Sequence, residues 1–356
     1  MNVRILQGVI ALCVVSVMAS AGSSGEFTGF KGWVSVNGER IPGVTVYAYG
    51  DYERGPASGP VAISGPSRAD GSFAVPLPAG SYFLVAAKTE SGNLAGWKAG
   101  DLYCFYGGNP VRVEEGRPSV IALSLLRVGG DPEPAAPYGI TGTVVDERGT
   151  PLSGAVVYAY KSAADGFRGM PGVFTRTRED GTFHLRVRKG TFFVLARKRE
   201  SGELFGPTVP GDSFGFYPGN PVTLAEGRGK GIRIDTRRRQ EVREKLGDLY
   251  VPAPAIILRA RVVDGSGRPA AGVRLLAYRN EGMTGFPAYV SSRSGNDGSV
   301  SLEVSEEGTY FLLARENLGG PADGELYGKY AGTKDHSVKA TRDGAVGTVE
   351  IVVERK

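Results

Sequence analysis

The stretch GTVVDERGTPLSGAVVYAY, residues 142–160, decides the fold of this 356-residue chain. In its second half, Ala155, Val157 and Ala159 alternate with their neighbours, which places all three on one face of a β-strand. Glycine and proline interrupt the apolar pattern in the middle of the stretch, and these residues are typical of turns. The stretch therefore predicts two short strands joined by a turn, with one face of the second strand pointing into a core.

The same pattern occurs three times along the chain. It recurs as GWVSVNGERIPGVTVYAY at residues 32–49 and as ARVVDGSGRPAAGVRLLAY at residues 260–278. An Asp-Gly turn and an apolar strand that begins with glycine follow each copy in the same order. Because the period is 111 and then 118 residues, it corresponds to whole domains in tandem rather than to the small units of a solenoid. The turns and strand starts are Asp70, Asp180 and Asp297, and Gly80, Gly190 and Gly308.

Each module contains about seven short apolar stretches separated by turn residues and no amphipathic helical stretch. The strands that begin at Tyr82, Phe192 and Tyr310 are apolar at consecutive positions, so both of their faces need cover and they should be central strands. This pattern predicts an all-β protein of three tandem antiparallel seven-stranded β-sandwiches with Greek-key connections.

Breaks in composition divide the chain into three modules, a leader and two linkers. The first linker is rich in proline, and the second is basic and compatible with a short helix of two or three turns. The predicted segments are a signal peptide at 1–21, module 1 at 27–128, the proline-rich linker at 129–137, module 2 at 138–236, the basic linker at 237–254 and module 3 at 255–356.

The N-terminal residues have the layout of a secretory signal peptide, with a basic start, an apolar run of about ten residues and the small-residue exit Ala19-Ser20-Ala21. This predicts export to the periplasm, the cell surface or the extracellular space. Two alternatives stay open: an uncleaved anchor, and lipidation at Cys13, although Leu12 precedes that cysteine where a small residue is usual. Removal of the signal peptide would leave Cys104 as the single cysteine. Its thiol could be buried, reactive or half of an intermolecular disulfide.

The pattern G-x-V-x-D-x-x-G-x-P-L-x-G-A-x-V-x-A, then D-G-x-F, then G-x-Y/F-x-L-x-A resembles the carboxypeptidase regulatory-like domain, a transthyretin-like sandwich. The match is fullest over residues 139–198. Module 1 has a shorter first loop, residues 37–42, and module 3 has Ala260 in place of the first glycine and Val300 in place of the phenylalanine. Its motif residues form turns and cores, so the resemblance implies a fold and little chemistry. Related carbohydrate-binding-like folds imply sugar binding as a possibility.

The residues that carry chemistry are scarce. The chain has only two histidines, His184 and His336, which belong to different modules, and it contains no peptidase, esterase, phosphate-binding or haem-attachment motif. A single aspartate in each Asp-Gly turn lacks the oxygen ligands that calcium needs. We therefore predict no catalytic residue, no metal and no cofactor, and the chain is predicted not to be an enzyme.

Aromatic side chains on the outer face of the second strand are the first candidate surface for a ligand or partner, since such rings stack on sugars and anchor proteins. The alternative is that they pack on the outer face of their sheet or against a neighbouring module. A second recurring element, Tyr-Gly-Gly-Asn-Pro at 106–110 and Tyr-Pro-Gly-Asn-Pro at 217–221, is interpreted as structural. The candidate surface residues are Tyr47, Tyr49, Trp97, Tyr158, Tyr160 and Tyr278.

The basic linker is the second candidate surface. Its positive charge would suit an anionic envelope, a polysaccharide or an acidic partner, and the alternative is an ordinary solvated linker. The residues of this basic patch are Arg237, Arg238, Arg239, Arg243 and Lys245.

Taken together, these features predict a secreted structural or adhesive protein that binds its partners through repeated sandwich surfaces. The expected partner is another envelope or extracellular protein, or a polysaccharide, and not nucleic acid, because export removes the chain from it. The alternative is a carbohydrate-binding protein that uses the outer-face tyrosines.

Overall fold

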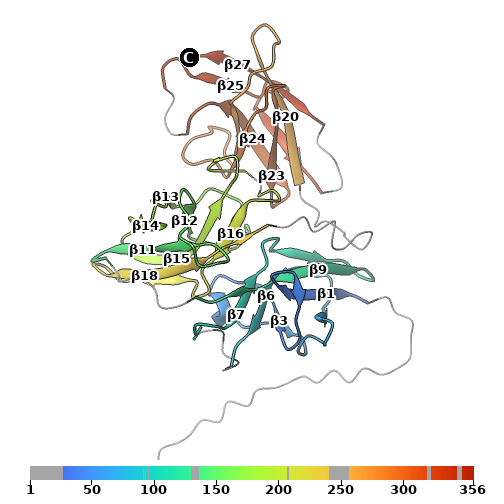
Figure 1. Cartoon of the computed structure of the whole chain (residues 1–356). Coiled ribbons are helices and arrows are strands. Elements are labelled where there is room, and N and C mark those ends of the chain that lie inside the picture. Colours follow the sequence, from blue (N-terminus) through green and yellow to red (C-terminus); the bar gives the residue numbers. More distant parts are fainter. Residues whose placement is uncertain are drawn as a thin grey trace, which may run out of the picture.

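A computed structural model shows a chain built from β-strands, in which three modules follow one another (Figure 1). Within the described residues, no helix is long and apolar enough to cross a membrane. The predicted signal peptide lies outside them. The structure describes residues 27–356 except 91, 93, 95, 130–135, 207, 240–255, 319–321 and 343–346.

Module 1 consists of two layers. One sheet has the order β5-β1-β9 with β2 at the end of β1, and the other has the order β10-β7-β6-β3-β4 with β8 alongside β6. A short 3₁₀ helix, η1 (Gly55–Ser58), follows β3. The strands are β1 (Gly29–Val36), β2 (Glu39–Arg40), β3 (Thr45–Tyr49), β4 (Ala62–Ile63), β5 (Ser72–Pro76), β6 (Gly80–Lys88), β7 (Leu102–Phe105), β8 (Val111–Val113), β9 (Pro118–Ser124) and β10 (Leu126–Arg127).

Module 2 repeats this arrangement. Its sheets have the orders β14-β11-β18 and β13-β12-β15-β16-β19, with β17 paired to β15. Its strands are β11 (Gly139–Val145), β12 (Val156–Tyr160), β13 (Val173–Arg176), β14 (Thr182–Leu185), β15 (Gly190–Lys198), β16 (Ser213–Phe216), β17 (Val222–Leu224), β18 (Gly229–Asp235) and β19 (Arg237–Arg238).

Module 3 has the same strands in one continuous hydrogen-bonded order, β22-β21-β24-β25-β27-β20-β23, because its last strand pairs with both layers. Its strands are β20 (Ile256–Asp264), β21 (Arg274–Tyr278), β22 (Tyr289–Arg293), β23 (Ser299–Val304), β24 (Gly308–Arg315), β25 (Leu326–Lys329), β26 (Ser337–Ala340) and β27 (Val349–Arg355).

The prediction of purely antiparallel sheets was wrong in one respect. The first and last long strands of every module pair in parallel, as β1 with β9, β11 with β18 and β20 with β27. Between these two strands the chain passes through the whole second sheet, and this long connection allows it to return in its original direction.

The predicted number of seven strands was also wrong. The three modules share eight strands, and modules 1 and 2 have short additional ones. The extra strands β10 and β19 arise because the last strand crosses from one sheet to the other at Leu125 and Thr236. The eighth shared strand, of three or four residues (β8, β17 or β26), pairs with the start of the central strand.

The predicted core faces are confirmed. The inward residues of the second strand are completely buried, as with Val46, Val157 and Leu275 at 0% exposure. The apolar strands β6, β15 and β24 lie between two neighbours in their sheets, as predicted for central strands. The glycines of the three Asp-Gly turns all have a positive φ in the left-handed region, a conformation that favours glycine.

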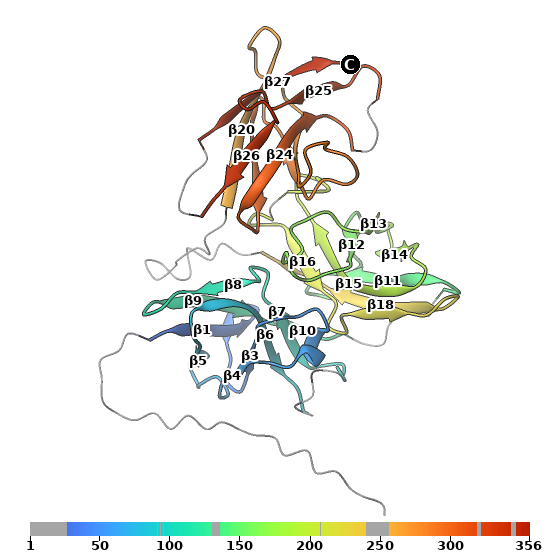
Figure 2. The same cartoon turned by 180° about the vertical axis from the view of Figure 1, so that it is seen from behind.

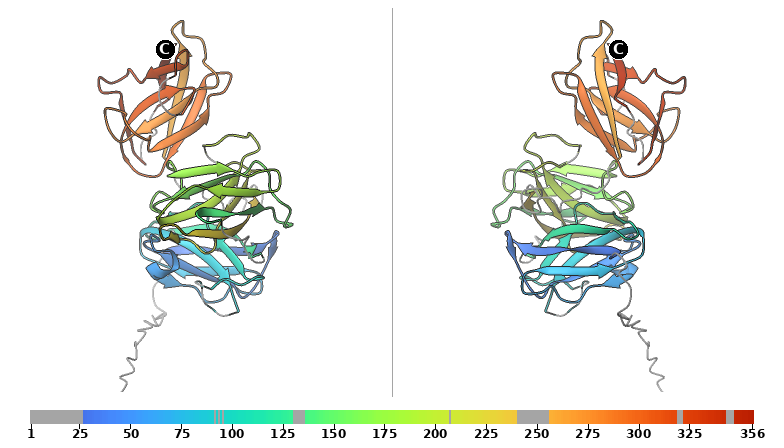
Figure 3. Two further views of the ribbon diagram at one scale, coloured as in Figure 1. Left: turned by 90° about the vertical axis from the view of Figure 1, so that its left-hand side faces the viewer. Right: turned by 90° about the vertical axis from the view of Figure 1, so that its right-hand side faces the viewer.

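Module 2 lies between modules 1 and 3 in every view (Figures 1, 2 and 3). Besides a core of its own, each module contributes buried side chains to a fourth hydrophobic cluster that spans all three. We call this cluster the aromatic hub. Its buried aromatic members are Tyr49, Tyr52, Phe83, Tyr103, Phe105, Tyr158, Tyr160, Phe167, Phe193, Phe205, Phe216 and Tyr278.

Candidate functional site

The tyrosines predicted to form a binding surface lie inside the aromatic hub. Tyr49 and Tyr158 are 1% exposed, and Tyr160 and Tyr278 are 6% and 4% exposed. Tyr47 and Trp97 are partly buried and pack against the hub. The outer sheet faces of the modules turn toward one another, so these rings bury apolar area between modules and do not form an exposed platform.

The contact between modules 1 and 2 is centred on two equivalent phenylalanines. The rings of Phe105 on β7 and Phe216 on β16 are stacked, with centroids 4.2 Å apart and an interplanar angle of 19°. Phe167, from the loop between β12 and β13, contacts both rings at 5.6 and 5.4 Å. Stacked and tilted rings at these distances stabilise beyond the burial of their area.

The contact between modules 1 and 2 repeats itself about a pseudo-two-fold axis. Gly55 of module 1 lies against Asn220 of module 2, where an added Cβ would be 2.6 Å from the Asn220 carbonyl oxygen. Gly166 of module 2 lies against Asn109 of module 1 in the same way, at 2.0 Å. The two glycines are 111 positions apart in the chain, and so are the two asparagines and the two phenylalanines. The same patch on both modules forms an interface of the kind that two-fold dimers use.

The recurring Asn-Pro element supports this interface. The Asn109 side chain accepts a hydrogen bond from Leu84 N at 2.8 Å and donates one to Leu84 O at 2.9 Å, and Asn220 does the same with Val194. Both asparagines are buried and both precede a cis proline. The element is therefore structural, as interpreted from its repetition.

The contact between modules 2 and 3 is more polar. Arg274 on β21 forms an ion pair with Glu203 at 2.5 Å, and Arg168 pairs with Glu303 on β23 at 3.0 Å. Met170 N donates a hydrogen bond to the Ala288 carbonyl oxygen at 3.1 Å. Module 3 carries Lys329 at the position of Phe105 and Phe216, which explains why it does not repeat the aromatic stack.

Two arginines hold the tyrosines of module 2 in place. The buried Arg199 donates hydrogen bonds to the Tyr158 hydroxyl at 2.9 Å and to the Gly206 carbonyl oxygen at 2.7 Å. Arg197 donates to the Phe167 carbonyl oxygen and lies over the Tyr158 ring, and burial lowers the pKa of its guanidinium. Burial also raises the pKa of Tyr160 to about 12. The terminal N–H groups of both arginines and the Tyr158 hydroxyl therefore form hydrogen bonds within the protein.

The basic patch is only partly described. Arg237 and Arg238 form strand β19, so the predicted helix does not begin there, and the rest of that stretch, with Arg243 and Lys245, lies outside the described residues. Arg237 lies 3.6 Å from the Cys104 sulfur, and Arg238 pairs with Glu200 at 2.9 Å. Arg239 donates hydrogen bonds to Thr208. These three arginines therefore contact other parts of the protein.

The lone thiol of Cys104 is buried at 3% exposure. It lies on β7, at the position that Gly215 and Gly328 occupy in the other modules. A Cβ at either glycine would lie 2.3 or 1.9 Å from a backbone oxygen of the crossing last strand, so only module 1 has room for a side chain there.

The two histidines do not converge. His184 hydrogen-bonds the Tyr138 carbonyl oxygen at 3.0 Å, and the His336 Nδ1 hydrogen-bonds that of Tyr330 at 2.6 Å, within their own modules. In the part of the chain that the structure describes, no three His, Cys, Asp or Glu side chains are grouped as metal ligands would be.

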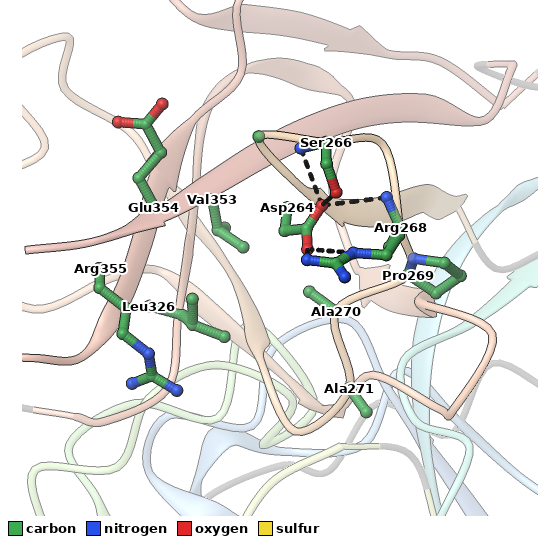
Figure 4. A pocket seen from close by; sticks show the side chains of 11 residues that line it. Asp264, Ser266, Arg268, Pro269, Ala270, Ala271, Leu326, Val353, Glu354 and Arg355 are labelled. Carbon is green, nitrogen blue, oxygen red and sulfur yellow. Dashed lines mark hydrogen bonds and ion pairs between the residues drawn. The ribbon is translucent and has the colours of Figure 1, made fainter.

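A pocket of about 580 Å³ lies in module 3 between the loop after β20 and the last strand β27 (Figure 4). Asp264 accepts hydrogen bonds from the Ser266 hydroxyl at 2.6 Å and from Arg268 N at 3.0 Å, and its second oxygen pairs with the Arg268 guanidinium. These bonds, the one from the Ser266 hydroxyl first, lower the pKa of Asp264 to about 2. Asp264 thus stabilises the turn after β20 by hydrogen bonds. Glu354 and Arg355 lie across the pocket from it.

Neither a protein-family model nor a curated protein sequence matches this chain. Among solved structures, it is similar to the TIE protein of Bacillus anthracis, with 14% identity over 93% of this chain and 51% of that one and a TM-score of 0.19. It thus spans about half the length of that protein. BcpA, the major pilin subunit of Bacillus cereus, has 11% identity over 92% and 99% of the chains and a TM-score of 0.20. The major pilin SpaD of Corynebacterium diphtheriae has 12% identity over 94% and 100%, with a TM-score of 0.20. At these scores the likenesses carry no argument about function.

Proposed function

We propose that this chain is an exported, non-catalytic structural or adhesive protein of the cell envelope or extracellular space. The observation that carries the proposal is the aromatic hub, which joins three sandwich modules through one buried cluster. Modules joined only by linkers move relative to one another, whereas a large apolar interface holds them in one arrangement. A protein of this kind can hold partner surfaces at a set distance and orientation.

The two module contacts support a permanent arrangement. The contact between modules 1 and 2 is aromatic and closely packed, and glycines at its edge leave no room for a Cβ. The contact between modules 2 and 3 includes the Arg274–Glu203 ion pair, in which the Arg274 side chain is 6% exposed. Ion pairs that are shielded from water fix the relative orientation of two surfaces more strictly than apolar contact alone. The partner would be another envelope or extracellular protein, or a polysaccharide.

Fractionation of the native host, followed by proximity labelling from the C-terminus, tests this function. The expected result is recovery of the chain in the envelope or medium, with labelled neighbours from the same compartment. Recovery in the cytosol would contradict the proposal, and so would hydrolase or oxygenase activity of the purified chain in a substrate panel.

A further inference from the structure

One sheet face of module 1 has an unusual composition. Among the outward residues of β1, β5 and β9, Lys31 is the one charged residue and Trp33 the one aromatic residue. The others are small or apolar, and none is acidic. They surround Trp33, which is half-buried on β1, next to Ser72 of β5 and Ala122 of β9 in the sheet register. The remaining outward residues are Lys31, Ser35, Ala74, Pro76, Pro118, Val120 and Ser124.

Two cations lie beside this ring. The guanidinium carbon of Arg40, on the short strand β2, is 4.6 Å from the centroid of the Trp33 ring. Lys31 is two residues from Trp33 on the same strand, which places both side chains on the same face of the sheet. The side chains of Lys31 and Arg40 are exposed. Neither has an ion pair or a side-chain hydrogen bond to any residue that the structure describes, so their donors are available to a ligand.

The nearby turn holds one carboxylate, Asp70, which interacts with the charge of Arg40 but forms no ion pair with it. The pKa of Asp70 is lowered mainly by hydrogen bonds from Ser72, and the charge of Arg40 is the smallest of the causes. The Asp70 carboxylate already accepts the Ser72 backbone N–H at 2.9 Å. The guanidinium is therefore stacked on an aromatic ring with its N–H edges free, an arrangement that suits a planar carboxylate.

The equivalent faces of the other modules differ. Module 2 has Thr143 and module 3 has Arg261 at the position of Trp33. Opposite them, where module 1 has Ala122, stand Arg233 and Glu350. Because the three modules share one fold, the tryptophan and its small neighbours are not required by the architecture. A feature that only one copy carries needs another explanation.

We propose that this face of module 1 binds an acidic polysaccharide. The apolar side of a sugar ring would pack on the Trp33 indole and the small residues around it, and the carboxylate of a uronic acid would pair with Arg40 or Lys31. The assignment deepens the proposed function by naming a ligand class, and it uses none of the aromatic residues of the hub.

Affinity electrophoresis of the mature chain in gels that contain polygalacturonate tests the assignment, with dextran as the neutral polymer. Trp33→Ala should weaken binding at least tenfold, and Trp33→Phe should retain most of it. The double variant Lys31→Gln, Arg40→Gln should weaken binding and remove most of its salt dependence. The matched controls lie in module 3: Phe286→Ala at an exposed ring, and Arg259→Gln with Arg261→Gln on the equivalent face. Neither should change the affinity.

Intrinsic fluorescence gives a second readout, because the chain has only two tryptophans. In a Trp97→Phe background, polygalacturonate should change the emission of Trp33. Unchanged binding in Trp33→Ala, equal binding to dextran, or no binding of polygalacturonate by the wild type would each overturn the assignment. Those results would say nothing against the hub or the export of the chain. The proposed function is tested separately, by the fractionation experiment.

Discussion

Replacing Gly166 with alanine tests the packing of modules 1 and 2 in the most defined way. Gly166 has φ of +59°, and an added Cβ would lie 2.0 Å from the Asn109 carbonyl oxygen of module 1. Gly202, also in module 2, has φ of +71° with no atom within 4 Å of the added Cβ. Both substitutions introduce a side chain into the left-handed region, and only Gly166→Ala also disturbs the contact between modules.

The two costs can be separated by subtraction. The left-handed conformation costs an alanine about 1–2 kcal/mol, and this cost is common to both variants. Forcing an extra methyl group into a packed contact adds about 1–3 kcal/mol. We expect Gly202→Ala to lower the stability by the first amount, and Gly166→Ala to lower it by the sum.

The assay is urea unfolding combined with the emission of Trp97 in a Trp33→Phe background. Trp97 packs against the hub, with its ring 4.7 Å from that of Tyr103, so its emission should shift to the red when the modules separate. Gly166→Ala should show this shift before global unfolding, and Gly202→Ala should not. Equal stability of the two variants, with identical Trp97 emission, would refute the reasoning.

Two further predictions concern charged groups in modules 2 and 3. Arg199→Met should lower the stability by about 1–3 kcal/mol, because it removes the donor to the half-buried Gly206 carbonyl oxygen and to the buried Tyr158 hydroxyl, whereas Arg178→Met at an exposed position should have little effect in the same urea titration. An Arg199→Met chain as stable as the wild type would show that this network contributes nothing. The pKa of Asp264 is lowered to about 2 from its ordinary 3.8, so its contribution to stability is present above pH 4 and is lost as the pH falls toward 2. Calorimetry between pH 5 and pH 2 should therefore show a smaller loss of melting temperature for Asp264→Asn than for the wild type, and parallel curves would contradict the hydrogen-bonded turn.

The repeat pattern was sufficient to predict the strands and their core faces, because alternation and turn residues are local signals. The inward faces of Val46, Val157 and Leu275 are examples. The parallel pairing of β1 with β9 was not predictable in this way, since it depends on how the chain returns to the first sheet. The crossing of the last strand of module 2 at Thr236 was not predictable either. Because of it, β18 pairs with β11 in one sheet and β19 pairs with β16 in the other.

The burial of the hub tyrosines could not be predicted from the sequence of a single module. Tyr158 alternates with core residues, which identifies it correctly as outward-facing in its own sheet. Only the neighbouring loops decide whether that outer face meets water or another module, and those loops vary among the copies. A signal was present in the glycines that recur at equivalent positions, Gly55 and Gly166, but their positive φ and their closeness to Asn220 and Asn109 appear only in three dimensions. The sequence identifies Trp33 only as a strand residue, because its surroundings depend on partners from β5 and β9.

Hydroxyl-radical footprinting of the chain, read by mass spectrometry, tests the shared hub most directly. Tyr138 is 49% exposed and provides an internal reference for a freely accessible ring. If the modules bury their outer faces together, Tyr49, Tyr158 and Tyr278 should be oxidised far more slowly than Tyr138 and about as slowly as the core ring of Tyr310. Oxidation of the three hub tyrosines at the rate of Tyr138 would contradict the account.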